Sequence, residues 1–200
     1  MKTTENPVTL HGETEFEGIH ISQTPGIKKH FQKILPEFDR VIEIGTFNGG
    51  LTLFIHRNKK ESCELISYDI DPSVNQAPKD LDIDFRIGNC MSVPVINEIK
   101  DLIMDESKRV LLLCDGGNKN EEFNLFSKFL KVKDVVMLHD FAESSGEFSR
   151  IASVIGWIYS YESSLSEISN SVSKYNLDKY WYDEGKEVLW GSFIKKGDIL

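Results

Sequence analysis

The chain has 200 residues, of which 40% are hydrophobic and 28% charged, so a folded core of ordinary size is expected. The formal net charge of −9 argues against nucleic acid and anionic membrane surfaces as partners. Three cysteines in strand-like contexts indicate reduced thiols, and no apolar run reaches the ~20 residues of a membrane helix. We therefore expect one cytoplasmic domain over residues 1–200, with residues 1–25 forming a polar, turn-rich arm.

Strand-like and helix-like segments alternate along the chain. Apolar residues at helical spacing predict helices over residues 27–35, 51–57, 95–103, 118–130 and 161–175. Short apolar runs predict strands over residues 41–45, 64–69, 83–88, 110–115, 134–138 and 188–195. This alternation predicts an α/β fold with a Rossmann-like, doubly wound sheet and helices on both faces.

The first strand of this sheet ends in an acid and a glycine turn, and a helix follows at once. Backbone amides of such a turn bind the polar groups of nucleotide-like ligands. The glycine spacing is not the G-x-G-x-x-G of dinucleotide sites. The ligand-binding candidates of this turn are Glu43, Gly45, Thr46, Phe47, Asn48 and Gly49.

Two further candidates for nucleoside binding stand at the ends of the next strands. Asp69 lies 24 residues after Gly45, where a carboxylate can accept hydrogen bonds from both hydroxyls of a ribose. Its alternative role is that of a solvated acid beside Asp71. Asn89 follows the third strand and is a candidate contact for the base, or else a turn residue.

Asp115 and Asp140 each close an apolar strand. Neighbouring strands lie ~4.8 Å apart, so both carboxylates are expected to meet at one edge of the sheet. Hard oxygen ligands beside an open cleft suit Mg²⁺, and His139 is a candidate third ligand. The alternatives are that each aspartate caps a turn or helix and that His139 is a structural histidine.

Lys119 follows Asp115 by four residues, on the expected cleft side of the turn. It is a candidate general base for a substrate hydroxyl if its surroundings lower its pKa. The alternative is a solvated residue at the start of a helix. The catalytic candidates are therefore Asp115, Lys119 and His139.

The series Glu43-x-Gly45, Asp69, Asn89, Asp115 and Asp140 resembles the class I S-adenosylmethionine (SAM)-dependent O-methyltransferases. The segments Asp115–Lys119 and Leu138–Phe141 resemble the cephalosporin-hydroxylase-like and macrolide or rhamnosyl O-methyltransferase group. The resemblance implies seven strands with the last one antiparallel, SAM as cofactor with Asp115 among its contacts, and Mg²⁺ at the acids ending the fourth and fifth strands. In catechol-type enzymes of this class, the lysine follows the strand-four acid by three residues rather than four.

We therefore expect methyl transfer from SAM to a hydroxyl oxygen of a small molecule, such as a sugar, with help from Mg²⁺. The alternatives are an NAD-linked Rossmann oxidoreductase and a non-catalytic SAM-binding domain. The sequence leaves the acceptor and the oligomeric state open, a homo-oligomer included.

Overall fold

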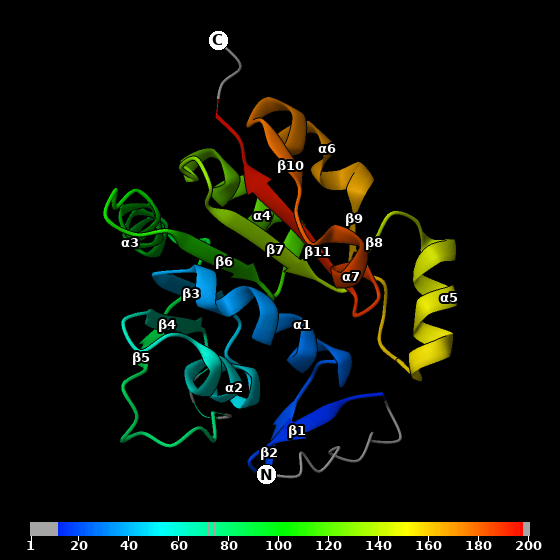
Figure 1. The fold of residues 1–200 in the computed structure, drawn as a ribbon, viewed down its shortest axis with the longest axis horizontal. Helices are drawn as coiled ribbons and strands as arrows, with labels where there is room; N and C mark the ends of the chain where they lie inside the picture. Colours follow the sequence, from blue (N-terminus) through cyan, green and yellow to red (C-terminus); the bar gives the residue numbers. More distant parts are fainter. Residues whose placement is uncertain (1–11, 72, 74, 198–200) are drawn as a thin grey trace.

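A seven-stranded sheet forms the centre of the computed structural model, which describes residues 12–71, 73 and 75–197. The strand order is β10-β11-β7-β6-β3-β4-β5 (Figure 1). The strands are β3 (Arg40–Ile44), β4 (Glu64–Asp69), β5 (Asp84–Ile87), β6 (Val110–Cys114), β7 (Val135–His139), β10 (Leu177–Lys179) and β11 (Trp190–Lys195). Only β11 runs against the others of this sheet. The expected mostly parallel sheet with an antiparallel last strand is confirmed.

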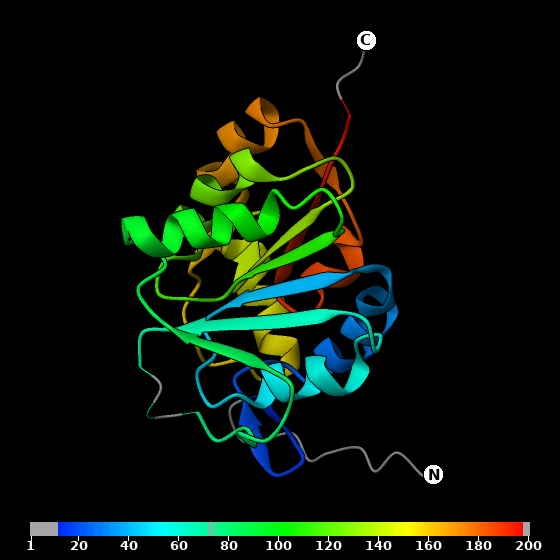
Figure 2. The same ribbon diagram turned by 90° about the vertical axis from the view of Figure 1, so that its left-hand side faces the viewer.

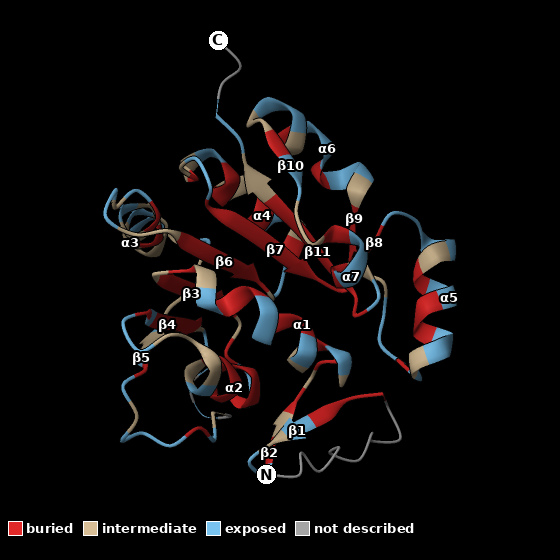
Figure 3. Ribbon diagram, in the orientation of Figure 1, coloured by how far each residue is buried: buried red, intermediate tan, exposed pale blue. Residues whose placement is uncertain are grey.

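Helices cover both faces of this sheet, as Figure 2 shows from the side. One face packs on α1 (Gly26–Ile34) and α2 (Gly50–Asn58). The other packs on α3 (Val93–Ile103), α4 (Lys119–Phe126) and α6 (Leu165–Lys174). Because both faces are covered, every residue of β3, β6 and β7 is buried (Figure 3), which explains the continuous apolar runs Val110–Cys114 and Val135–Leu138. Within the described residues, no helix is long and apolar enough to cross a membrane.

The strand order reverses beside β3. From β3 the chain passes through α2 to β4 on one side, and later returns through α3 to β6 on the other side. Ile44 therefore lies between Tyr68 of β4 and Cys114 of β6 in the sheet register. In open α/β sheets, ligands bind at the carboxyl ends of the strands at such a reversal.

The structure departs from the sequence-based prediction in the arm. Residues after 11 form a hairpin of β1 (Thr14–Phe16) and β2 (Ile19–Ile21), and residues 1–11 lie outside the described part. This hairpin packs closely on α2, since a Cβ on Gly50 would lie 2.2 Å from the carbonyl oxygen of His20. The described part of the arm is therefore a packed element of the fold.

The segment after β7 also differs. It contains a helix that was not predicted, α5 (Ser145–Ile155), and two short paired strands, β8 (Phe141–Ala142) and β9 (Ser163–Ser164). The predicted helix over residues 161–175 begins only at Leu165, because β9 pairs with β8 and the Ser164 hydroxyl accepts from the Glu167 amide. A further short helix, α7 (Tyr182–Lys186), precedes β11.

Candidate active site

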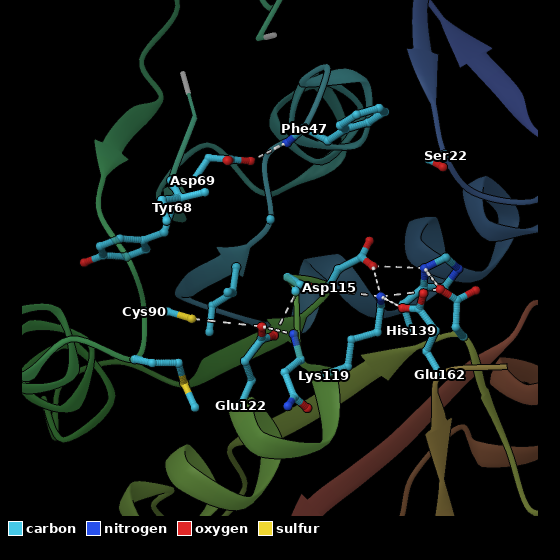
Figure 4. A pocket seen from close by; sticks show the side chains of 18 of the residues that line it. Ser22, Phe47, Tyr68, Asp69, Cys90, Asp115, Lys119, Glu122, His139 and Glu162 are labelled. Atoms are coloured by element: carbon cyan, nitrogen blue, oxygen red, sulfur yellow. Dashed lines mark hydrogen bonds and ion pairs between the residues drawn. The ribbon is translucent and has the colours of Figure 1, made fainter. Parts of the chain in front are cut away.

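A cavity of about 550 Å³ opens at the carboxyl ends of β3, β4, β6 and β7. Figure 4 shows Asp69 on one side of Asp115, and His139 and Glu162 on the other. Among the predicted site residues, the lining contains Gly45, Phe47, Asp69, Asn89, Asp115, Lys119, His139 and Asp140. The structure thus brings eight candidates from five separate segments into one cavity.

The turn after β3 packs closely against the end of β6. Gly45 has a positive φ of 97°, and a Cβ there would lie 2.2 Å from the carbonyl oxygen of Asp115. Its amide donates to the Tyr68 carbonyl at 2.8 Å. Glycine is required here by backbone packing as well as by φ, because a side chain would push the two strand ends apart.

Glu43 and Thr46 lie beneath this turn and do not line the cavity. Glu43 is fully buried, and its carboxylate accepts hydrogen bonds from the hydroxyls of Thr52 and Ser67. Burial raises the pKa of Glu43 to about 8. The Thr46 hydroxyl bonds to that of Ser67 at 2.6 Å. Both residues hold the turn in place from below.

The part of the turn around Phe47 is hydrogen-bonded to Asp69. The Phe47 amide donates to one carboxylate oxygen of Asp69 at 2.7 Å, and the Asp71 amide donates to the other at 2.9 Å. Asp69 also faces the cavity. Asn48 and Gly49 are not part of the cavity lining and lie against residues 75–77.

The wall beyond Asp69 combines apolar and amide groups with one buried acid. Asn89, Cys90 and Met91 line it after β5, and Glu122 of α4 lies opposite. The Glu122 carboxylate accepts from the amides of Gly116 and Asn118, and burial raises its pKa to about 7. Glu122 therefore fixes the loop after β6 and presents a carboxyl group of nearly neutral pKa to the cavity.

Asp115 and His139 form a bonded pair at the centre of the site. Asp115 Oδ1 and His139 Nδ1 lie 2.9 Å apart, and the Gln23 amide nitrogen donates to Asp115 Oδ2 at 2.6 Å. Gln23 in turn accepts from the Trp190 indole at 2.8 Å, while His139 stacks on Trp190. Burial lowers the pKa of His139, but the carboxylates of Asp140 and Asp115 outweigh it and the net shift is upward.

The Lys119 ammonium group lies among three carboxylates. Its Nζ is 3.9 Å from Asp115 Oδ1, 3.4 Å from Asp140 Oδ2 and 2.5 Å from Glu162 Oε2. Burial would lower the pKa of Lys119, but these acids together raise it above its ordinary value. The lowered pKa that a general base at Lys119 would need is therefore not what these surroundings produce, because they favour the charged ammonium form.

The predicted ligands of Mg²⁺ lie close together, but the Lys119 ammonium group lies beside their carboxylates. Asp115, His139 and Asp140 approach one another, with His139 Nδ1 3.6 Å from Asp140 Oδ2. In the described part of the chain, no group of three or more His, Cys, Asp or Glu side chains is arranged to hold a metal ion. As they lie, the side chains do not fit a divalent ion, because the Lys119 ammonium group faces the carboxylates.

Several lining residues were not predicted from the sequence. Trp157, Tyr159 and Glu162 come from the segment between α5 and β9, and Ser22 comes from the arm. The Trp157 indole donates to Asp140 Oδ1 at 3.2 Å. No periodic or spacing signal marks these residues, so only the folding of that segment over the strand ends reveals them.

Comparison with known proteins bears on the fold. No family model matches the sequence, and no curated protein matches it. Solved structures do match: CmcI without ligand at 15% identity and a TM-score of 0.66, and CmcI with Mg and SAM at 15% and 0.65. Each pairing covers 92% of this chain and 76% of the other.

A more distant match is human N-acetylserotonin methyltransferase in complex with SAM, at 13% identity and a TM-score of 0.53. That pairing covers 86% of this chain and 52% of the human protein. At such identities the likeness shows the fold. The chain therefore has the Rossmann-like fold found in these structures, with its cavity at the reversal of strand order.

Proposed function

We propose that the protein is a SAM-dependent methyltransferase that transfers a methyl group to a hydroxyl oxygen of a small molecule. The observation that carries this proposal is one continuous cavity with the Asp69 carboxylate at one end and the Asp115–His139 pair beside Lys119 at the other. Its volume of about 550 Å³ lies in the usual range for small-molecule sites. The names of similar structures, which include methyltransferases and proteins solved with SAM, support the choice of cofactor.

The residues present fit a SAM molecule. Asp69 offers its carboxylate to the ribose hydroxyls, and Cys90 and Met91 offer apolar surface to the adenine ring beside Asn89. When bound, SAM supplies an electrophilic methyl group, whose bond to sulfur breaks as the bond to the acceptor oxygen forms. Gly45 and Phe47 also line the cavity, and the Phe47 amide is bonded to Asp69.

The other half of the cavity supports the acceptor. The proton of the acceptor hydroxyl passes to the Asp115–His139 pair, in which Asp115 reaches the cavity and His139 shares the charge. Trp157 and Tyr159 line the cavity together with Glu162, and the Trp157 indole donates to the carboxylate of Asp140. Aromatic faces beside hydrogen-bonding acids suit a polyhydroxylated acceptor such as a sugar.

Calorimetry with S-adenosylhomocysteine (SAH) and NAD tests the cofactor assignment. We expect SAH to bind and NAD to give no heat; the reverse result would replace this proposal with the oxidoreductase alternative. SAH release should then be measured over a panel of sugars, catechols and simple alcohols. Binding of SAH without turnover of any hydroxyl acceptor would favour the non-catalytic SAM-binding alternative.

A further inference from the structure

We propose that the Lys119 ammonium group serves as the resident cation of the active site, in the place where related chemistry would use a divalent metal ion. The inference deepens the proposed methyl transfer and rests on it for its catalytic part. It starts from the arrangement of four side chains: Lys119 at the centre, and Asp115, Asp140 and Glu162 around it.

The position of Lys119 is fixed by the fold. Lys119 opens α4 directly after the Asn118 cap, and its side chain is only 7% exposed. Its Nζ also donates to the Gly116 carbonyl at 3.4 Å, so the side chain turns back over the loop that ends β6. A lysine that merely started a solvated helix would extend away from the cavity and would stay exposed.

The surrounding charges need a cation. Asp115 and Asp140 end neighbouring strands, and both lie within 4 Å of the His139 Nδ1. Carboxylates brought this close repel one another unless positive charge or a proton lies between them. Lys119 supplies one positive charge in contact with both of them, and a divalent ion at the same place would have to displace it or meet its repulsion.

The same charge is placed to act on the acceptor. Lys119, Asp115 and Asp140 all line the cavity, so an acceptor oxygen that loses its proton to the Asp115–His139 pair develops negative charge close to the ammonium group. A preorganised cation stabilises such charge without reorganisation during the reaction. Lys119 would thereby do electrostatically what a Lewis acid does in a metal-dependent enzyme.

Magnesium titration of the wild-type protein and of Lys119→Gln tests the proposal. We expect wild type to show no heat with millimolar MgCl₂, an unchanged melting temperature, and methyl transfer that survives EDTA. Lys119→Gln should bind Mg²⁺ about tenfold more tightly or better, because the competing charge is removed. Its melting temperature should rise with Mg²⁺, and its residual methyl transfer should become sensitive to EDTA.

Lys131→Gln is the matched control. Lys131 is also a largely buried lysine, 14% exposed, and it pairs with Asp134 at 2.8 Å away from the cavity. This variant should lose stability without gaining a response to Mg²⁺. The proposal is overturned if wild type binds Mg²⁺ and EDTA abolishes its activity, or if Lys119→Gln folds but gains no affinity for Mg²⁺. If that variant does not fold, the wild-type titration decides alone. Binding of SAH is measured separately, so failure of the methyltransferase assignment remains distinguishable.

Discussion

The backbone amide of Phe47 donates a 2.7 Å hydrogen bond to the carboxylate of Asp69 and so joins the turn after β3 to the end of β4. Phe47 adopts a positive φ of 45° in making this bond, and both residues line the cavity. One carboxylate thus anchors the turn and remains placed for the ribose of a bound nucleoside.

Asp69→Asn should weaken SAH binding by ~1.5–3 kcal/mol, because charge-assisted hydrogen bonds to the ribose are lost while an acceptor for the Phe47 amide remains. Isothermal calorimetry measures the change. Asp71→Asn is the control, since Asp71 bonds to the Ser73 amide and does not line the cavity. Equal affinity of both variants and wild type would remove Asp69 from the cofactor site.

Gly45→Ala should lower the free energy of unfolding by roughly 1–3 kcal/mol, the range for a strained backbone conformation. The new Cβ would meet the Asp115 carbonyl oxygen at 2.2 Å, at a φ of 97°. Urea denaturation measures the loss. Gly117→Ala is the control, because a Cβ there has no neighbour within 4 Å. A fully stable Gly45→Ala protein would contradict the packing described for this turn.

His30 should make the fold sensitive to acid. It is 5% exposed, and neither ring nitrogen has a hydrogen-bond partner among the described residues. Burial lowers its pKa to about 4, with Glu184 acting in the opposite direction. Because the folded-state pKa is below the unfolded one, the contribution to stability is full above pH ~6.5 and is lost as the pH falls toward 4, by at most ~1.4 kcal/mol per pH unit.

Urea denaturation of wild type and His30→Phe at pH 7 and pH 5 measures this effect. The difference in stability between the two pH values should be smaller in the variant, which carries no ionisable ring. An identical pH dependence would show that acid sensitivity arises elsewhere in the chain.

Tyr159→Phe should loosen the arm at the mouth of the cavity. The Glu13 carboxylate accepts from the Tyr159 hydroxyl at 2.9 Å, and it also bonds His20 and Ser22. Loss of one such bond is worth ~0.5–1.5 kcal/mol, so amide hydrogens of β1 and β2 should exchange faster. Tyr161→Phe is the control, since the Tyr161 hydroxyl bonds to the Ala142 carbonyl instead. Unchanged exchange in the Tyr159 variant would contradict this link.

The buried parallel strands could be predicted from the sequence because their apolar residues follow one another directly along the chain. Residues Val110–Cys114 and Val135–Leu138 are continuously apolar, as is typical of strands covered on both faces. The β1–β2 hairpin could not be predicted, since two three-residue strands are too short to show a period. Its position depends on packing against α2, which is a tertiary contact.

The candidate site likewise contains residues that could be predicted from the sequence and one whose role could not. Asp69, Asp115 and Asp140 could be predicted because each ends a strand, and strand ends meet at one edge of the sheet. The role of Lys119 could not, since its sequence neighbours Asn118 and Asn120 are typical of a solvated helix start. Its charged neighbours Asp140 and Glu162 are distant in the sequence, so only the folded structure shows that Lys119 is a buried cation paired with them.

Because His139 stacks on Trp190, tryptophan fluorescence can report on changes at the candidate site. Trp190 lies 5.1 Å from the His139 ring and Trp157 lies 5.7 Å from it, measured between ring centroids. The third tryptophan, Trp181, packs near Lys33 instead. In a Trp181→Phe protein, selectively excited tryptophan fluorescence would therefore come from the two indoles beside His139, and ligand titrations could be followed by this emission without any added label.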